Sequence, residues 1–384
     1  MASIQASAVV PMKASETSRM RTGFEELVAH RTRPPFAFCA EDDGVVLDIN
    51  EELKTMVVKY KNGKKVCVRY GEEYSNNTSN GFFVNQDVIL NGFKKGDRFS
   101  KNDVLTYNRE FFQADPFSKS TVRYKLGVQA HVAILDNGGT IEDASILTQP
   151  LCEKMEFYPV HQVDVVITPD TNIRSFAKIG DFVNSTEPIA VFDESPFEVE
   201  AGADAEYIDM LSKLNTTNKK AGHTGTIVKI EALYACPVSQ MTPSLQKLVK
   251  YAVATRDKQS DYAKGCENAS DFVKSVPLPS QMGKEAKVGL VEITSDVVMI
   301  RFYIKQIKGM SPGDKLFFGP SLKSVCSQVY PDYIEVEDGS VKVEACTSAR
   351  GILQRIVSSP FLTGIGNRVL EKVEQDILAM WDEN

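Results

Sequence analysis

The sequence predicts a mostly β fold with a smaller helical content. Runs rich in β-branched and aromatic residues recur along the chain, and turns rich in Gly, Asn, Asp and Pro separate them. Helical periodicity is limited to residues 16–30, 203–214 and 244–256 and to a segment near the C-terminus. A polar, aperiodic stretch at 256–286 interrupts the pattern and predicts a surface loop.

Short apolar runs account for the predicted strands. Asn62-Gly63 separates the second run from the third and is a strong signal for a β-hairpin turn. A Gly/Pro turn at residues 311–314 follows the last run. In chain order the strands are expected at residues 45–49, 54–60, 66–70, 82–84, 88–90, 126–135, 163–167, 188–192, 226–230 and 297–305.

Each predicted helix carries an apolar stripe at helical spacing. The third helix starts at Pro243, a residue favoured in the first helical turn. In chain order the stripes are Phe24, Leu27 and Val28; Tyr207, Ile208, Leu211 and Leu214; Leu245, Leu248, Val249 and Ala252; and Leu370, Val373, Ile377 and Trp381.

The composition narrows the class of protein. At 384 residues the chain has room for two or three domains, each with its own core. A net charge of −7 argues against a chain that coats nucleic acid by itself. Seven dispersed cysteines without a C-x-x-C pair and four dispersed histidines predict neither a disulfide framework nor a metal cluster. Without a signal peptide or a membrane span, we expect a soluble intracellular protein.

Two lysines, Lys315 and Lys323, are the most informative candidates for binding chemistry. They follow the apolar run 297–305 and the Gly/Pro turn, which is expected to place both on a loop at the exit of that strand. Two ammonium groups that face one ligand suit a polyanion, and phosphate is the obvious choice. The alternative is an ordinary solvated surface.

Two carboxylates form a second candidate group. Glu142-Asp143 directly follows the turn Asp136-Asn-Gly-Gly and precedes an apolar segment. Hard cations such as Mg²⁺ prefer oxygen ligands, so the pair suits a position beside a metal ion or a basic substrate group. The alternative is that these residues cap a helix, because acidic side chains favour a first helical turn.

Arg19 and Arg355 are candidates for phosphate binding only because the chain also carries the two lysines and the two carboxylates. A guanidinium matches phosphate oxygens in a bidentate manner, although a single arginine is usually a helix-surface residue. The sequence has no G-x-S-x-G, no Walker phosphate loop, no H-E-x-x-H and no compact Asp-x-Asp-x-Asp. If the chain takes part in an enzyme, we therefore expect it to contact substrate phosphates while another polypeptide supplies the metal.

The ordered set of segments resembles the C-terminal half of the β subunit of multisubunit DNA-dependent RNA polymerases. Residues 126–135 and 137–147 resemble the family's Leu-Gly-Gln-Asn and Asn-Gly-Tyr-Asn-Phe-Glu-Asp-Ser/Ala-Ile-Leu. Arg19 and Gly23 match its Asn-Arg-x-x-x-Gly, with Ser18 in place of Asn. Further matches are residues 10–34, 45–70 and 92–98, the lysines in Gly313-Asp-Lys and at 323, and Gly351-Ile-Leu-Gln-Arg-Ile against Gly-Val-Pro-Ser-Arg-Met.

The chain also departs from the family. The family loop Gly-Arg-His-Gly-Asn-Lys-Gly is replaced by residues 318–324, Phe-Gly-Pro-Ser-Leu-Lys-Ser, so Lys323 is matched by spacing and not by its neighbours. The match covers about the second half of a cellular β subunit and lacks the family's C-terminal clamp-anchoring segment. A divided and divergent subunit of this kind resembles the split-subunit polymerases of giant (jumbo) tailed bacteriophages.

The resemblance implies a fold and a domain order. It implies a double-psi β-barrel interrupted by a flap module, with helical segments at both ends of the chain. Residues 1–95 would form the fork and hybrid-binding region and residues 96–155 the first part of the barrel. Residues 156–290 would form the flap-like insertion, with a tip helix at 203–214, and residues 291–384 the second part of the barrel and the C-terminal helices.

The resemblance also implies roles for single residues. Lys315 and Lys323 would contact the RNA 3′ end and nucleotide phosphates, and Arg19 and Arg355 would hold the incoming triphosphate. Glu142-Asp143 would lie near the second Mg²⁺, with Asp143 in its outer shell. The tip-helix residues Tyr207, Ile208 and Leu211 would dock a promoter-specificity factor; the alternative is that they pack on the flap.

These roles describe a nucleotidyltransferase subunit that is inactive as an isolated chain. Its implied partners are a polypeptide with the N-terminal half of β and β′-like subunits that bind the catalytic Mg²⁺, together with template DNA, RNA and nucleoside triphosphates. The expected location is the interior of the host cell, or the virion. The alternatives are a non-catalytic structural or regulatory β-barrel module of a transcription complex and a self-contained small-molecule enzyme.

Overall fold

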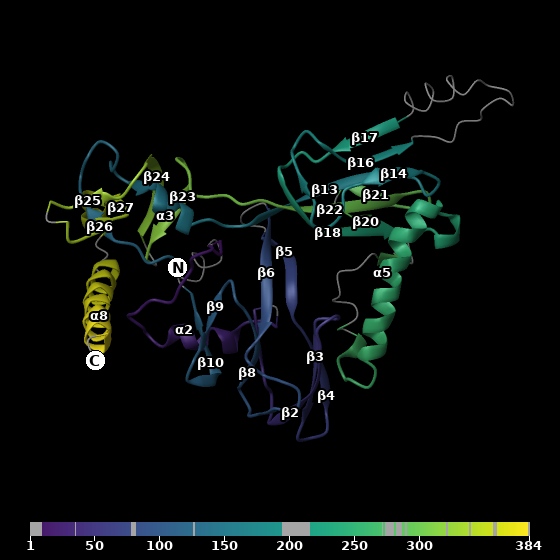
Figure 1. Cartoon of the computed structure of the whole chain (residues 1–384), viewed down its shortest axis with the longest axis horizontal. Helices are drawn as coiled ribbons and strands as arrows, with labels where there is room; N and C mark the ends of the chain where they lie inside the picture. Colours follow the sequence, from purple (N-terminus) through teal and green to yellow (C-terminus); the bar gives the residue numbers. More distant parts are fainter. Residues whose placement is uncertain are drawn as a thin grey trace. The chain divides into compact units, whose positions relative to one another are not determined.

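The chain forms two compact units, which Figure 1 shows in the colours of the sequence. Unit 1 consists of Met1–Val45, Tyr70–Tyr158 and Ile307–Asn384, and unit 2 of Val46–Arg69 and Pro159–Gln306. Strands make up 42% of the structure and helices 20%, which confirms the predicted mostly β class. The computed structural model describes residues 10–34, 36–77, 82–125, 127–193, 216–270, 272, 280–281, 286–288, 290–319, 322–337, 339–355 and 359–382.

Unit 1 contains a mixed five-stranded sheet that two distant parts of the sequence build together (Figure 1). The strand order is β11-β27-β12-β24-β23. The first four strands come alternately from before and after residues 159–306, and β23 forms the edge. β12 pairs in parallel with β24 and antiparallel with β27. The bounds are β11 Val132–Ile134, β12 Ala144–Thr148, β23 Lys315–Phe318, β24 Leu322–Tyr330 and β27 Ala345–Thr347.

One face of this sheet closes over a hydrophobic core. Leu147, Cys326 and Ala345 come from three of its strands, and Leu151 comes from the helix α3, Gln149–Lys154. The other elements of unit 1 are α2 Phe24–Leu27, η1 Ala29–Arg31, β1 Ala37–Cys39, β5 Gly71–Asn77, β6 Phe82–Leu90, β7 Arg98–Phe99, β8 Val104–Asn108, β9 Phe112–Asp115, β10 Ser118–Tyr124, β25 Ile334–Glu335, β26 Lys342–Val343, α7 Ala349–Arg355 and α8 Ser359–Asp382.

Unit 2 is built around the long antiparallel strands β13, β22 and β18. Arg301 of β22 donates two hydrogen bonds to the Asp164 carboxylate of β13, at 2.7 and 2.9 Å. The elements are β2 Gly44–Asn50, which starts in unit 1, β3 Thr55–Tyr60, β4 Lys65–Arg69, β13 Pro159–Ile167, β14 Ile173–Phe176, β15 Phe182–Val183, β16 Pro188–Asp193, β17 Thr216–Lys220, β18 Gly225–Tyr234, η2 Val238–Gln240, α5 Pro243–Tyr262, β19 Ser280–Gln281, β20 Ala286–Val288, β21 Val291–Ile293 and β22 Val298–Lys305.

Local signals placed several elements correctly. The Asn62-Gly63 turn joins β3 to β4, and Gly63 has a φ of 87°, a value that glycine adopts readily. The expected helix near the C-terminus is α8, and the one at 244–256 is the first part of α5.

Four local predictions were wrong in extent. The helix expected at 16–30 begins only at Phe24, because Gly23 is left-handed with a φ of 84° and Thr22 bonds to the Glu25 carboxylate at the start of the helix. Residues 256–262 continue α5, since Arg, Lys and Gln favour helices. Residues 82–84 and 88–90 form one strand, β6.

The long strand expected at 126–135 is reduced to β11. Gly127 has a φ of 137°, outside the range of an ordinary strand, and forms an isolated bridge with Glu16. The Gln129 amide donates to the Glu16 carboxylate, so Glu16 draws this segment away from a regular ladder. The segment 203–214, with Tyr207, Ile208 and Leu211, lies outside the described residues.

Candidate functional site

The two lysines lie on one hairpin and not on a loop. Lys315 begins β23 and Lys323 is in β24, with Lys315 opposite Val325 and Phe317 opposite Lys323. Strand formation extends to both lysines because Leu316 and Leu322 are buried on the inner face of the hairpin. The expectation that both lysines lie on a loop was therefore wrong.

The register puts both ammonium groups on the same side of the sheet. Lys323 and Val325 are two residues apart in one strand and so share a face, and Lys315 is directly opposite Val325. Lys315 and Lys323 are therefore diagonal neighbours, whose Cα atoms are typically about 7–8 Å apart. Both lysines are exposed, while Ser324 between Lys323 and Val325 points inward and is 4% exposed.

The turn before β23 fixes the start of this strand at Lys315. Ser311 donates its backbone N–H to the Asp314 carboxylate at 2.9 Å, and Gly313 has a φ of 96°. The Gly313 N–H donates to the Cys326 carbonyl at 2.7 Å, and the Cys326 N–H donates to the Asp314 carbonyl at 2.8 Å. The Gly/Pro turn is thus hydrogen-bonded to β24, which holds the first lysine against the second strand.

The carboxylates Glu142 and Asp143 lie beside this hairpin. The Asp143 carbonyl accepts hydrogen bonds from the Ser324 hydroxyl at 2.6 Å and from the Val325 N–H at 2.8 Å. Both acidic residues are exposed and belong to a turn that leads into β12. The alternative that they cap a helix was wrong, because a strand follows them.

The turn at Glu142 is held in an uncommon backbone conformation. Glu142 has a φ of 53°, in the left-handed region that non-glycine residues occupy at a cost of about 1–3 kcal/mol. Helix α7 presses against it: a Cβ atom added to Gly351 would lie 2.7 Å from the Glu142 carbonyl oxygen. The close approach of these two backbones therefore requires glycine at position 351.

A set of buried and half-buried hydroxyl groups joins the strands behind the site. Ser145 of β12 shares a short hydrogen bond with Ser324 of β24 and donates to Thr347 of β27 at 3.3 Å. Ser327 of β24 donates to the Ser145 carbonyl at 3.0 Å and also to the Gly139 carbonyl. These bonds fix the strand that carries Lys323 against the turn that carries the carboxylates.

Asp136 anchors helix α7, which ends at Arg355. Its carboxylate accepts hydrogen bonds from the Ser348 hydroxyl at 2.8 Å and from the Ala349 N–H at 3.0 Å. The Ser348 hydrogen bond, followed by those from the backbone of α7, lowers the pKa of Asp136. Arg355 is the last residue of α7 in the described backbone, and the position of its side chain lies outside the description.

Arg19 lies against the C-terminal helix. Its Nε donates to the Glu374 carboxylate of α8 at 2.8 Å, and this hydrogen bond raises the pKa of the guanidinium. The neighbouring residues Ser18 and Met20 both donate to Asn367 of α8, at 3.1 and 2.7 Å. The fold thus connects Arg19 to α8, and the lysines and carboxylates to one another.

Sequence reasoning missed the residues that position this site: Asp136, Ser145, Ser324, Ser327, Thr347 and Ser348. Only Ser348 carried a usable signal, because a serine directly before a helix is a favoured N-cap. The other hydroxyl residues meet across strands far apart in the sequence, so no local pattern marks them.

The charged side chains of this site suit the binding of anions and cations. Among the described residues, no group of three or more His, Cys, Asp and Glu side chains is arranged to hold a metal ion. The cysteines are poor candidates for metal ligands. Six of the seven are buried, and burial raises the pKa of Cys152 to about 11. Glu142 and Asp143 therefore fit a metal only as part of a larger ligand set.

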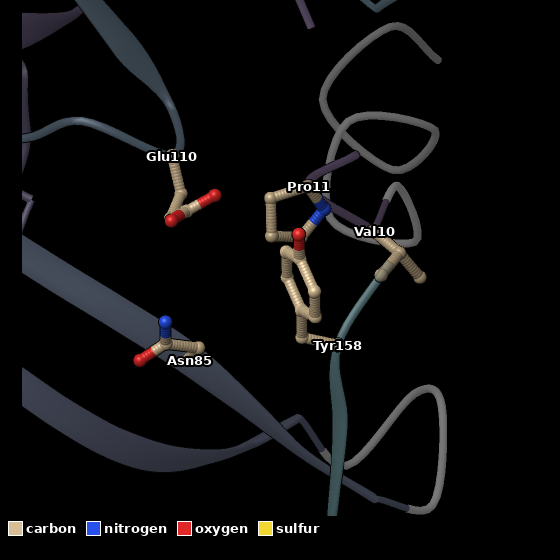
Figure 2. Close-up of a pocket in the computed structure, with 5 residues that line it drawn as sticks. All are labelled: Val10, Pro11, Asn85, Glu110 and Tyr158. Atoms are coloured by element: carbon tan, nitrogen blue, oxygen red, sulfur yellow. The ribbon is translucent and has the colours of Figure 1, made fainter. Parts of the chain in front are cut away.

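A shallow pocket lies elsewhere in unit 1 (Figure 2). Its lining residues are Val10, Pro11, Asn85, Glu110 and Tyr158, and it holds about 180 Å³ including space open to solvent. Sites for drug-sized ligands usually enclose about 300 Å³ or more. None of the candidate site residues lines this pocket, so it is not the nucleotide site expected from the sequence.

A scan against protein-family models finds no match to this chain, and a search of curated proteins finds none either. No helix in the described part of the chain has the length and apolar character needed to cross a membrane.

Proposed function

We propose that the chain is a β-subunit fragment of a multisubunit DNA-dependent RNA polymerase, of the divided type found in giant tailed phages. The observation that carries the proposal is the parallel pairing of β12 with β24. It brings Glu142-Asp143 next to the strand of Lys323, although about 180 residues separate them in the sequence. Adjacent cations and carboxylates suit a phosphate chain that carries Mg²⁺.

In this proposal the two interleaved chain segments are the halves of a double-psi β-barrel, with the flap as the insertion between them. Lys315 and Lys323 bind the RNA 3′ end and the nucleotide phosphates. Glu142-Asp143 lies beside the second Mg²⁺, and a β′-like partner supplies the aspartates that hold the catalytic ion. Phosphoryl transfer depends mainly on positioning and charge stabilisation, so cations from a second subunit contribute directly to the rate.

Arg19 and Arg355 complete the triphosphate contacts. A guanidinium has five N–H donors, and Glu374 takes the Nε of Arg19, so phosphate would bind through the terminal nitrogens or displace Glu374. The pair with Glu374 orients the guanidinium before substrate arrives. Arg355 follows Gly351 on α7, and the contact of that helix with Glu142 links it to the carboxylate turn.

The test is nucleotide addition by a complex reconstituted from this chain, the N-terminal β polypeptide and the β′-like subunits. Removing one phosphate-binding cation costs on the order of 2–4 kcal/mol of transition-state stabilisation. Lys315→Ala and Lys323→Ala should each slow addition by about 30- to 900-fold, since 1.36 kcal/mol is tenfold in rate. Lys101→Ala, at an exposed lysine of unit 1 outside the site, is the matched control.

A non-catalytic structural or regulatory module of a transcription complex is the second candidate. It is favoured by the sequence of residues 318–324, where the family's Arg, His and Asn are replaced. An assembled complex whose rate is unchanged by both lysine substitutions would support this candidate and overturn the catalytic one.

A further inference from the structure

Two cysteines that are 199 residues apart in the sequence meet inside unit 2. The Sγ atoms of Cys67, in β4, and Cys266, which follows α5, are 3.0 Å apart. Cys67 is 3% exposed and Cys266 is 9% exposed, and both carry free thiols. Val57, Ala263 and Phe272 belong to the same hydrophobic cluster. The fold therefore holds two thiols in contact in an apolar environment.

The thiols meet because the segment after α5 runs along an edge of a sheet. The strand order β4-β3-β2-β7 places β4 at that edge. The Asn268 side chain accepts a hydrogen bond from the Cys67 N–H at 2.9 Å and donates one to the Cys67 carbonyl at 2.7 Å. The Glu267 N–H donates to the Lys65 carbonyl at 2.9 Å. These backbone contacts hold Cys266 against β4.

The end of α5 is bound to the same sheet by polar contacts. Tyr262, the last residue of the helix, donates its hydroxyl to the Asp48 carboxylate of β2 at 2.8 Å. Lys258 pairs with Glu52 at 3.1 Å, but both side chains are exposed, and such pairs contribute little to stability. Figure 1 shows this end of α5 beside β3 and β4. A covalent bond between the two sulfur atoms would therefore be the strongest connection of this segment to the sheet.

A disulfide requires only a small movement of the two sulfur atoms. The S–S bond is about 2.05 Å long, so the atoms would have to approach by about 1 Å, which side-chain rotation can supply. The alternative for two adjacent thiols is a zinc site, which takes three or four protein ligands. In the described part of the chain, no third His, Cys, Asp or Glu completes such a site with this pair.

We infer that Cys67 and Cys266 form a reversible disulfide on exposure to a hydroperoxide, and that this bond fastens the segment after α5 to β4. The disulfide depends only on the packing of the two cysteines, so it is expected whether or not the chain belongs to a polymerase. Cellular reductants keep most thiols reduced. The bond should therefore form during oxidative exposure and be lost when reducing conditions return.

The two cysteines have different parts in the reaction. Gly265 and Glu267 on either side of Cys266 are exposed, so the peroxide reaches this sulfur first. Burial, followed by the hydrogen bond to Cys266, raises the pKa of Cys67, which therefore remains a thiol at neutral pH. Hydrogen peroxide converts the Cys266 thiol to a sulfenic acid and releases water. The Cys67 sulfur then displaces hydroxide, which leaves with the Cys67 proton as a second water. Both sulfur atoms are oxidised, and the two peroxide oxygens are reduced.

Peptide mapping of the full-length chain tests whether the bond forms. The chain is exposed to hydrogen peroxide, unfolded with an alkylating reagent and digested with trypsin without reduction. We expect a linked product of peptides 66–69 and 265–274, lighter by two hydrogen atoms than the separate peptides and lost after treatment with dithiothreitol. Cys236 is the control, because it is 0% exposed and the described residues of its core cluster include no other cysteine. It should be recovered alkylated.

Hydrogen exchange tests whether the bond fastens the segment. In the oxidised chain, exchange in a peptide that contains Glu267 should slow by about 30-fold or more, the lower end of the effect of one disulfide. Peroxide-treated Cys266→Ser is the matched control and should show no slowing. Cys266→Ala takes its place if the serine variant does not fold.

Three results would overturn the inference. These are recovery of both cysteines in alkylated form, oxidation of each to a separate sulfinic acid, and a linked product whose exchange around Glu267 is unchanged. Linkage of Cys236 to either cysteine in equal yield would also overturn it, because the reaction would then not depend on the packing of the pair. Neither measurement involves nucleotide addition, so their failure is distinguishable from failure of the lysine substitutions.

Discussion

Substituting Gly351 tests whether α7 must contact the Glu142 turn as closely as the structure indicates. A Cβ atom at this position would lie 2.7 Å from the Glu142 carbonyl oxygen, far inside ordinary van der Waals contact. Both groups belong to backbones, so no flexible side chain can move aside. We place the cost of Gly351→Ala near the top of the range for overpacking, about 3 kcal/mol.

Helix propensity acts in the opposite direction. Alanine is better than glycine inside a helix by about 1 kcal/mol, so the net loss for Gly351→Ala is about 2 kcal/mol. Two glycines of α8 provide matched controls. Gly364 has no atom within 4 Å of an added Cβ, so Gly364→Ala should stabilise by up to about 1 kcal/mol. At Gly366 the added Cβ would meet the flexible Met20 side chain at 2.7 Å, so the effect should fall between the other two.

The assay is urea unfolding of the full-length chain, followed by circular dichroism. The expected order of stability is Gly364→Ala, wild type and then Gly351→Ala, with Gly366→Ala between the two variants. If Gly351→Ala gains as much stability as Gly364→Ala does, α7 does not press on the Glu142 turn. In that case the contact does not shape the carboxylate site.

Two further predictions concern the groups that hold the site. Ser324→Ala removes the hydroxyl bonded to Ser145 and Asp143, and should lower the free energy of unfolding by about 1–3 kcal/mol, whereas alanine at the exposed Ser295 should not. The pKa of Asp136 is lowered in the fold, so its contribution is complete above its ordinary pKa, near 3.8, and is lost as the pH falls through the lowered value. Asp136→Asn keeps the hydrogen-bond acceptor, so acid unfolding should become less steep below about pH 4; an unchanged slope would contradict this role.

Several parts of the fold could be predicted from local sequence. The strands β3, β4, β13, β18 and β22 coincide with β-branched runs, and the Asn-Gly turn joins β3 to β4. The helices α5 and α8 follow from their apolar spacing. These elements depend on interactions between residues a few positions apart, so they can be predicted from helix and strand propensities.

The secondary structure around the candidate site could not be predicted from local sequence. The sequence identified Lys315 and Lys323 but assigned them to a loop, because it did not indicate that β23 and β24 pair over a buried face. It identified Glu142-Asp143 but left open a helix cap, because nothing local showed that a strand follows and pairs with β24. Both errors concern partners that are distant in the sequence.

A mostly β chain with two lysines, two adjacent carboxylates and an amphipathic C-terminal helix could be inferred from the order of the residues. That the lysines share one face of a hairpin, that the carboxylate turn lies beside it, and that the apolar side chains of α8 are exposed became known from the folded chain. The pairing of β12 with β24 and the polar contacts of α8 join residues far apart in the sequence. Propensity and periodicity describe only neighbours along the chain.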